Sequence, residues 1–448
     1  MPDTDMNTSD LIVIGAGPGG YEIAARQAAE GRAVTLIERA DLGGTCLNRG
    51  CIPTKCLCAS ASAILQAASA ADFGVELGEV RPDYARAAAR MRAVVAGLRD
   101  DVAAVTSKCN VVRGEARFLP DGTVAVGDEV YSAPKVLIAT GSKPATLPVP
   151  GAELAITSDD FLCLDSLPQS VAVIGGGVIG LEFASIMAAF GVQVTVIEYC
   201  KEILPPFDRE VAKRLRSMIS RRSVKFIVGA AVTAIEEMPD GRRRVVYQGK
   251  KGPEAVEADA VLMAVGRRPV IPEGLAEAGI EVDARGRIVT DDTMQTTRPG
   301  VYAVGDCNGR MMLAHAASAQ AEVALGADIR LDVIPSAVFC EPEAAMVGLT
   351  TEQAEAQGIA YKTSKAMFAA NGKARAMGHA DGLVKLVYDP ETRRLLGCHI
   401  VGPHAADLVT EAAMAIATDS TVDTIGTTVV HGHPTLSEVV KSAARQAR

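Results

Sequence analysis

Short apolar runs alternate with longer Ala-rich stretches along most of the chain, and this alternation predicts an α/β fold. A short apolar run bounded by turn residues is typical of a buried strand, whereas a long Ala-rich stretch favours a helix. The expected strands lie at residues 11–14, 34–37, 136–142, 171–174, 192–197, 261–265 and 300–306, with further short strands within 111–130. The expected helices lie at 60–71 and 82–108.

The pattern changes near residue 334, beyond which a separate C-terminal domain is expected. Two apolar runs, 383–388 and 395–401, flank a short polar turn and predict a β-hairpin. Residues 405–418 follow, with apolar side chains on one face of a predicted helix. A sheet backed by helices is therefore expected here. Earlier in the chain, the three prolines of 143–150 indicate a linker between domains.

The first strand runs into G-A-G-P-G-G, a dinucleotide-binding fingerprint. Gly15 allows a tight turn, Gly17 lets a pyrophosphate approach the helix N-terminus, and Gly20 lets the helix pack against the strand. The second strand ends at Glu38, which is 38 − 20 = 18 residues beyond the last glycine. A carboxylate at this place can accept hydrogen bonds from ribose hydroxyls. The complete pattern predicts a bound dinucleotide.

The fingerprint recurs 160 residues later, since 175 − 15 = 160 and 198 − 38 = 160. The second copy has Gly175, Gly177, Gly180 and the strand-end acid Glu198. A duplicate can persist for structural reasons alone, but this copy contains all three glycines and the acid. Two bound dinucleotides are therefore expected. Glu198 favours a free ribose 2′-hydroxyl, so the second copy is expected to select NAD over NADP.

Two thiols, Cys46 and Cys51, lie in a glycine-flanked turn and predict a redox centre. No second Cys/His cluster accompanies them, so a structural zinc site is disfavoured, and no metal is expected. A disulfide between them needs a distorted turn, which Gly50 and Pro53 are expected to supply, the proline by disfavouring helix at Ile52. Such a disulfide would be reducible. The alternative is a pair of unbonded buried thiols.

The stretch G-G-T-C-L-N-R-G-C-I-P-T-K at 43–55 resembles the active-site motif of the flavin-dependent pyridine nucleotide-disulfide oxidoreductases, and the likeness extends over nearly the whole chain. The resemblance implies an α/β protein with two Rossmann-like dinucleotide-binding domains and a C-terminal α+β dimerisation domain. FAD is expected on the first fingerprint and NAD on the second. The implied domains are an FAD-binding domain at 1–145 and 270–335, an NAD-binding domain at 146–269 and a dimerisation domain at 336–448.

The resemblance also implies roles for single residues. Cys51 is expected to face the flavin and Cys46 to exchange with substrate, while Lys55 lies against the flavin ring and pairs with Glu182. An ordinary exposed lysine at 55 is the alternative. Asp306 is expected to hold the ribityl chain of FAD, although an acid there could instead cap the next helix. The other cofactor contacts implied are Gly44, Thr45, Gly114, Thr140, Gly141, Ser142, Ala314, Val232 and Gly266.

The segment H-G-H-P-T-L-S-E near the C-terminus predicts a general base. Pro434 keeps His433 out of helical geometry just ahead of a predicted helix, and Glu438 could hold its ring. Glu438 could instead reach back to Thr435 in a capping box. The motif resembles the dihydrolipoamide dehydrogenase branch of the family more than glutathione reductases. That resemblance implies a His-Glu pair contributed by the neighbouring subunit of a homodimer.

Composition and charge limit the binding partners and the cellular location that are expected. The net charge of −9 disfavours nucleic acid, and no run of eighteen apolar residues favours a membrane. Residues 1–10 have neither a basic nor an apolar block, so a cytoplasmic location is expected. Ten cysteines in 448 residues are too sparse for a disulfide scaffold. The roles of Cys56, Cys58 and Cys307 are open.

Taken with the residues above, the resemblance implies an FAD enzyme that oxidises protein-bound dihydrolipoyl groups and reduces NAD through a Cys46–Cys51 disulfide. No lipoyl-bearing segment precedes the first strand, so the lipoyl group is expected on a partner protein of a 2-oxoacid dehydrogenase complex or glycine-cleavage system. A related reductase with a glutathione-type or mercuric substrate is the alternative. A non-catalytic flavoprotein sensor is less favoured, because both thiols and the His-Glu pair are present.

Overall fold

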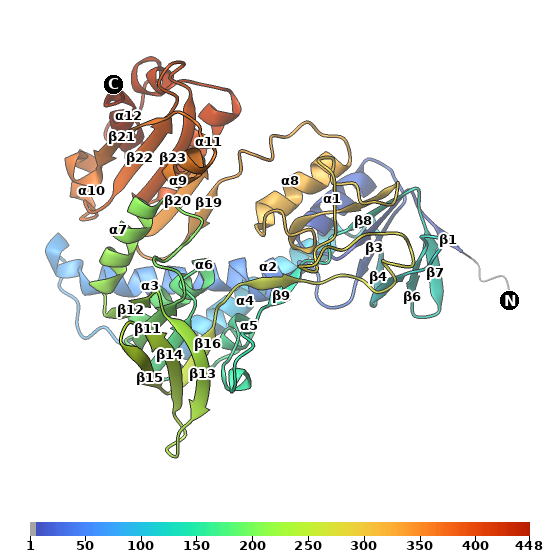
Figure 1. Cartoon of the computed structure of the whole chain (residues 1–448), viewed down its shortest axis with the longest axis horizontal. Coiled ribbons are helices and arrows are strands. Elements are labelled where there is room, and N and C mark those ends of the chain that lie inside the picture. The colour runs from blue at the N-terminus through green and yellow to red at the C-terminus, as the bar shows by residue number, and fades with distance from the viewer. Residues whose placement is uncertain (1–5) are drawn as a thin grey trace. The chain divides into compact units, whose positions relative to one another are not determined.

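The computed structural model describes residues 6–448, so the first five residues of the 1–10 segment discussed above lie outside the described residues. The chain forms two compact units (Figure 1). The first contains the chain up to residue 56 with 86–145 and 267–331, and the second contains 57–85, 146–266 and 332–448.

The first unit is built on three sheets, one of them the two-stranded pair of β9 and β17, and the helices packed on them. Its strands are β1 (Asn7–Thr8), β2 (Leu11–Ile14), β3 (Val34–Glu38), β4 (Asn110–Arg113), β5 (Ala116–Phe118), β6 (Val124–Val126), β7 (Glu129–Ser132), β8 (Lys135–Ile138), β9 (Ser142–Pro144), β17 (Arg267–Pro269) and β18 (Val301–Ala303). Its helices are α1 (Pro18–Ala29), α2 (Gly44–Arg49), most of α4 (Tyr84–Val105), η3 (Gly305–Cys307) and α8 (Ala314–Ala324), and α3 (Cys51–Ala68) begins in it.

The main sheet of this unit is parallel and has the order β18-β8-β2-β3-β4. Its central strand β2 is buried on both faces. Ile12 and Ile14 pack into a core with the small sheet β1-β7-β6-β5, whereas Leu11 and Val13 pack into a core with α1 and α8. This alternation is the period-2 pattern of a strand, and it explains why the strand is apolar at every position.

The second unit contains three sheets. Its strands are β10 (Ser170–Ile174), β11 (Gln193–Glu198), β12 (Val224–Val228), β13 (Ala231–Glu237), β14 (Arg243–Gly249), β15 (Gly252–Ala258), β16 (Ala260–Met263), β19 (Ser336–Val338), β20 (Glu343–Gly348), β21 (Lys362–Met367), β22 (Leu383–Tyr388) and β23 (Leu395–Gly402). Its helices are η1 (Ala70–Phe73), η2 (Ala152–Leu154), α5 (Ser158–Phe161), α6 (Val178–Ala189), α7 (Arg209–Ser220), α9 (Thr351–Ala356), η4 (Phe368–Ala370), α10 (Gly372–Ala376), α11 (Ala405–Ala417), the π-helical turn η5 (Thr424–Thr428) and α12 (Glu438–Arg445).

A parallel sheet, β12-β11-β10-β16, forms the nucleotide-binding part of this unit, and a three-stranded antiparallel sheet, β13-β14-β15, accompanies it. The C-terminal sheet, β19-β20-β23-β22-β21, is antiparallel throughout. Helices α11 and α12 share a core with it. The predicted α/β fold class, the hairpin of β22 and β23 and the helix α11 are confirmed.

Two predicted helices differ from the observed ones. Helix α4 is shorter than 82–108, and the helix expected at 60–71 is α3, which begins nine residues earlier at Cys51. The expectation that Pro53 keeps Ile52 out of a helix is wrong. Pro53 lies in the first turn of α3, where its missing N–H would have no partner within the helix in any case.

By length and composition, the segment Gly44–Ala68 is apolar enough to cross a membrane. It is nevertheless broken at Gly50, which separates α2 from α3, and it carries Arg49 and Lys55. A single segment of this kind is weak support for membrane insertion.

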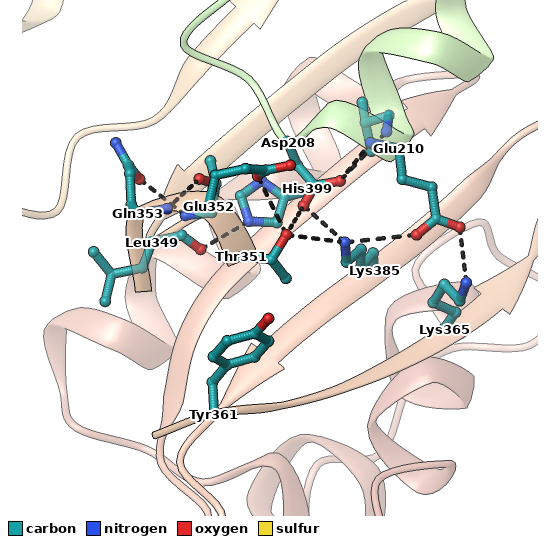
Figure 2. A network of polar contacts seen from close by, with 12 residues as sticks. Asp208, Glu210, Leu349, Thr351, Glu352, Gln353, Tyr361, Lys365, Lys385 and His399 are labelled. Carbon is teal, nitrogen blue, oxygen red and sulfur yellow. Dashed lines mark hydrogen bonds and ion pairs between the residues drawn. The ribbon is translucent and has the colours of Figure 1, made fainter. Parts of the chain in front are cut away.

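A buried polar network joins the parallel-sheet part of the second unit to its C-terminal sheet (Figure 2). Asp208 caps α7 by accepting hydrogen bonds from the backbone N–H groups of Glu210 and Val211. Its other oxygen accepts from Lys385 Nζ at 2.8 Å and from Thr351 Oγ1 at 3.1 Å. The Asp208 and Lys385 side chains are 0% and 8% exposed. A single carboxylate therefore satisfies a helix end and a lysine of β22 together.

Burial and charge act in opposite directions within this network. Burial alone would raise the pKa of Asp208, but the hydrogen bond and charge of Lys385 hold it below the ordinary value. His399, the cross-strand partner of Lys385, is fully buried and donates from Nε2 to Leu349 O at 2.9 Å. Burial lowers the pKa of His399, although Asp208 opposes that shift. The network thus favours a charged aspartate beside a neutral histidine.

We expect Lys385→Met to lower the free energy of unfolding by about 3–5 kcal/mol, because it leaves the Asp208 charge buried without its cation. The matched control is Lys365→Met, whose ion pair with Glu210 is 2.7 Å long but has both side chains at least 40% exposed, so about 1 kcal/mol or less is expected. Because the pKa of Asp208 is depressed, the buried pair stabilises above about pH 4, and that stabilisation is lost as the pH falls further. Urea unfolding at several pH values measures both effects. Similar losses for the two variants would contradict this account.

Candidate active site

Three glycines shape the turn between β2 and α1, each for a different reason. Gly15 has φ of +103°, and a Cβ there would lie 2.4 Å from the carbonyl oxygen of Ala139. A Cβ on Gly20 would lie 1.8 Å from the oxygen of Gly15, so this glycine permits the helix to pack on the strand. Gly17 is the N-cap of α1, and a Cβ there would meet nothing within 4 Å. Open space at a helix N-terminus suits a pyrophosphate.

Glu38 lies at the end of β3 beside this turn and is 8% exposed. Its Oε2 accepts a hydrogen bond from the backbone N–H of Ala16 at 2.7 Å, and its Oε1 accepts one from Ala40 at 2.8 Å. The backbone N–H of Gly114 donates to the carbonyl oxygen of Glu38 at 3.1 Å. The carboxylate is therefore fixed next to the glycine turn, as the fingerprint predicts, and Gly114 lies at the same edge of the sheet.

The second copy reproduces this geometry bond for bond. Glu198 Oε2 accepts from the N–H of Gly176 at 2.5 Å, and its Oε1 accepts from Cys200 at 2.6 Å. These donors are 160 residues beyond Ala16 and Ala40. Gly177 has open space where a Cβ would project, and a Cβ on Gly180 would lie 2.0 Å from the oxygen of Gly175. Both turns thus have the cradle that a dinucleotide requires.

The thiol turn is built directly against the first glycine turn. The N–H of Gly43 donates to the carbonyl oxygen of Ala16 at 2.8 Å. Gly44 has φ of +58°, and a Cβ there would lie 2.7 Å from the Cα of Gly17. Only a glycine allows this approach without a shift of the backbone. Helix α2, which carries Thr45 and Cys46, therefore starts at the expected pyrophosphate site.

Gly50 interrupts the helix between the two thiols, with φ of −145° and ψ of −112°. This break confirms the distorted turn expected between Cys46 and Cys51. Cys51 is hydrogen-bonded to Cys46. That hydrogen bond and burial raise the pKa of Cys46, whereas the charge of Lys55 acts to lower it. The lysine is therefore close enough to act on the thiol pair.

Tyr21 is a neighbour of the thiols that the sequence reasoning missed. Burial, together with the nearby Glu22 and Cys46, raises its pKa to about 12. Its hydroxyl lies 3.3 Å from Glu22 Oε1. A tyrosine in the first turn of an expected helix gives no signal of this kind, because whether it lies near Cys46 depends on how α1 and α2 meet.

Asp306 follows β18 at the carboxyl end of the parallel sheet, in η3. Its carboxylate accepts a hydrogen bond from Ser142 Oγ. The same Ser142 Oγ accepts a hydrogen bond from Arg267 Nε at 2.7 Å. The alternative that Asp306 caps the next helix is wrong, because the N-cap of α8 is Leu313 and no side chain caps it. Arg267 was not expected here. The sequence G-R-R-P at 266–269 predicts a turn with a positive charge, but it does not identify the residue that the arginine contacts.

The neighbouring predicted residues lie around the same edge. Thr140 Oγ1 donates to the carbonyl oxygen of Val270 at 2.5 Å, and Gly141 has φ of +70°. Ala314 is the first residue of α8. Cys307 is fully buried, donates to the carbonyl oxygen of Val304 and has its pKa raised to about 11 by burial. This last thiol therefore packs the sheet and is poorly suited to redox exchange.

The remaining cofactor residues belong to the second unit. Glu182, in α6, is 3% exposed, and its Oε1 accepts from the backbone N–H of Phe339 at 3.0 Å. Val232 lies at an irregularity of β13, and Gly266 has φ of +109° beyond β16. Lys55 belongs to the first unit, so its pairing with Glu182 stays an expectation.

His433 and Glu438 form a close pair just before and at the start of α12. The Nδ1 atom of His433 lies 3.1 Å and 3.2 Å from the two oxygens of Glu438. The N–H of Thr435 also donates to Glu438 Oε2 at 3.1 Å. The two roles treated as alternatives thus coexist in one carboxylate. Its pKa is lowered by the hydrogen bond from Thr435 and then by the one from His433.

The His433 side chain is 80% exposed, whereas that of Glu438 is 26% exposed. An acid–base group that works on a thiol is expected to be enclosed when substrate binds.

Among residues 6–448, no three His, Cys, Asp or Glu side chains gather as a metal site would require.

Comparisons with known proteins agree with this geometry. Residues 9–321 match the family described as pyridine nucleotide-disulphide oxidoreductase, and residues 334–444 match the dimerisation domain of that family. The chain is 41% identical to the dihydrolipoyl dehydrogenase of Thermus scotoductus, with 98% of this chain and 97% of that protein covered. It is 39% identical to that of Chlamydia muridarum, with 97% and 96% covered.

Solved structures give a similar result. The HOCl-induced flavoprotein disulfide reductase RclA from Escherichia coli superposes with a TM-score of 0.86 at 28% identity. The match covers 98% of this chain and 100% of that one.

We expect Gly177→Ala to impair cofactor binding and Gly180→Ala to impair stability. A methyl group at 177 projects into open space where a pyrophosphate would lie, so the KM for NAD should rise about tenfold or more with little change in Tm. A methyl group at 180 collides with the backbone of Gly175, so Tm should fall, with a loss of about 1–3 kcal/mol. Steady-state kinetics and thermal unfolding of both variants test this. Equal losses of Tm would refute the distinction.

Proposed function

This chain belongs to the pyridine nucleotide-disulphide oxidoreductase family, and on that premise we propose that it is an FAD-dependent dihydrolipoamide dehydrogenase. It oxidises protein-bound dihydrolipoyl groups and reduces NAD. The observation that carries the proposal is the thiol turn packed on the first glycine turn through Gly43 and Gly44, because it sets a redox-active pair beside one of two dinucleotide sites.

The residues present fit both cofactors. Open space at Gly17 and Gly177, together with the fixed carboxylates of Glu38 and Glu198, supports one dinucleotide on each turn. Bound FAD supplies a two-electron acceptor between the thiols and NAD. The remaining cofactor contacts are proposed as expected from the sequence, with Asp306 held by Ser142 at the carboxyl end of the sheet.

The chain's own thiols perform the disulfide exchange. One substrate thiolate attacks Cys46 of the Cys46–Cys51 disulfide, Cys51 leaves as the thiolate, and the second substrate thiol then displaces Cys46. The substrate loses two electrons and two protons and becomes a cyclic disulfide, and the enzyme gains a dithiol. Lys55 stabilises thiolate charge at this pair.

His433 accepts the protons of the substrate dithiol, and Glu438 orients its ring through Nδ1. The exposure of His433 in a single chain supports a site completed by a second copy. The matched dimerisation domain supports a homodimer. We therefore assign His433 and Glu438 to the active site of the partner subunit, opposite Cys46.

Three further assignments complete the proposal. The functional domains are 1–145 with 270–335 for FAD, 146–269 for NAD and 336–448 for dimerisation. The lipoyl group arrives on a partner from a 2-oxoacid dehydrogenase complex or glycine-cleavage system, and the enzyme works in the cytoplasm.

Turnover with dihydrolipoamide, compared with glutathione disulfide reduction using NADH and NADPH, tests the substrate. Preferred glutathione reduction would reject the proposal.

Glu198 should determine the choice of nicotinamide cofactor. Its carboxylate faces the second glycine turn and would repel a ribose 2′-phosphate, so NAD should have the higher kcat/KM. Glu198→Arg should weaken the use of NAD and favour NADP. Comparable kcat/KM for NAD and NADP in the unmodified enzyme would contradict this prediction.

Complementation between subunits tests the shared site. His433→Ala should slow turnover by about 10²- to 10⁴-fold with FAD retained, because a general base is removed. Cys46→Ser should abolish it. Mixed dimers of the two inactive chains should regain activity, since each contains one intact site. Native mass spectrometry of differently tagged chains verifies the exchange. Heterodimers that form but remain inactive would overturn the assignment to the partner subunit.

A further inference from the structure

The first histidine of the H-G-H-P segment, His431, takes no part in the chemistry proposed above, yet it is the more deeply buried of the two. Its side chain is 3% exposed, compared with 80% for His433. Val430, between η5 and His431, is 89% exposed. The His431 ring is therefore turned inward from a segment in which Val430 and His433 are exposed. It is buried within the protein, whereas the His433 ring is exposed on its surface.

Glu411 of helix α11 holds the buried ring. The Nε2 atom of His431 lies 2.7 Å from Glu411 Oε1, and because the carboxylate accepts, the ring N–H donates. Helix α11 is itself packed into the core of the C-terminal sheet through residues such as Ala412 and Ala415. The pair therefore ties an irregular surface segment to a helix that the core holds in place.

Few other bonds hold this segment. Within residues 6–448, none of the backbone N–H groups from 430 to 433 donates a hydrogen bond, and Pro434 has no N–H to donate. The nearest backbone donor on the N-terminal side is Val429, which donates to Thr424 at 2.9 Å. On the C-terminal side, Thr435 Oγ1 donates to Gly432 O at 2.8 Å. The His431–Glu411 pair is thus a principal constraint on the backbone that carries His433.

Packing alone does not account for a histidine at position 431. Its second ring nitrogen, Nδ1, is buried and has no hydrogen-bond partner among the described residues. Burying such an acceptor is unfavourable, whereas an apolar side chain would fill the space without that penalty. What an apolar side chain cannot provide is the directed bond to Glu411. The unpartnered nitrogen therefore indicates that the bond itself has a role.

We infer that His431 and Glu411 are positioning residues for the dithiol-oxidation step, which they serve by fixing the backbone two residues before His433. The inference rests on the proposed role of His433 as the proton acceptor. Displacement of a catalytic group by about 1 Å can lower a rate on the order of 10²-fold, so a loose segment would slow proton transfer even with His433 and Glu438 intact.

The test separates two half-reactions of the FAD-loaded enzyme by stopped-flow absorbance. Reduction by dihydrolipoamide requires His433, whereas reduction by NADH does not. His431→Leu should slow the first about 10- to 10²-fold and leave the second unchanged, with a smaller effect on the KM for dihydrolipoamide. His431→Gln should recover part of the rate, because its amide N–H can still donate to Glu411.

Glu411 provides an independent pair of variants. Glu411→Gln retains an oxygen that accepts from His431 and should stay within about threefold of the unmodified rate, whereas Glu411→Leu should match His431→Leu. The control is His404→Asn, which removes the other His–carboxylate contact of α11, an exposed one of 3.6 Å to Asp407, and should change neither half-reaction. Asparagine tolerates the positive φ of position 404.

The outcomes distinguish this inference from the proposed function. If His433→Ala slows the dithiol half-reaction and His431→Leu does not, the positioning role is refuted and the proposed function stands. If His431→Leu slows both half-reactions alike, its role is general structure and the inference also fails. If His433→Ala keeps the full dithiol rate, the proposed role of His433 itself fails. Should His431→Leu not fold, equal dithiol rates for Glu411→Gln and Glu411→Leu would overturn the inference.

Discussion

The close approach of Gly44 to Gly17 is the constraint on which the active site depends. A Cβ at Gly44 would lie 2.7 Å from the Cα of Gly17, and the neighbouring N–H of Gly43 donates to the carbonyl oxygen of Ala16. The thiol turn and the dinucleotide turn are therefore parts of one backbone assembly. Because two backbones meet without intervening side chains, the position of Cys46 follows from the position of β2. A redox pair that exchanges electrons with a bound dinucleotide requires such a fixed separation.

Features that depend on local backbone chemistry could be predicted from the sequence. The strand–glycine turn–helix units, their terminal acids and the break at Gly50 all follow from residues close together in the chain, and the structure contains each of them. Pro53 misled the prediction, because the effect of proline depends on its place in a helix, and a first-turn proline is tolerated. The rule that proline disfavours helix at the preceding residue holds inside a helix, but the sequence did not show that α3 begins just before Pro53.

Features that depend on contacts between distant segments could not be predicted. Arg267 reaches Ser142 over 125 residues, and the Asp208–Lys385 pair spans 177. His431 appeared in a motif, but its partner Glu411 is one of several acids on helices, and nothing in the local sequence selects it. Sequence patterns identify which groups can form a bond. The fold determines which of them meet.

The two glycine turns show how a small change after a common motif separates their functions. In the second copy, the N–H of Leu204 donates to the carbonyl oxygen of Gly176, which is 160 residues beyond the Ala16 acceptor used by Gly43. Leu204 is also 160 residues beyond Gly44 and likewise has a positive φ, +48° compared with +58°. Leu204 is 1% exposed and fills space with its side chain, whereas Gly44 has none and admits the backbone of the cofactor turn. Each glycine turn therefore accepts a backbone hydrogen bond from the segment that follows its strand-end acid, but the donor differs by one residue, and only the first copy has the glycine at 44 that lets the two backbones meet.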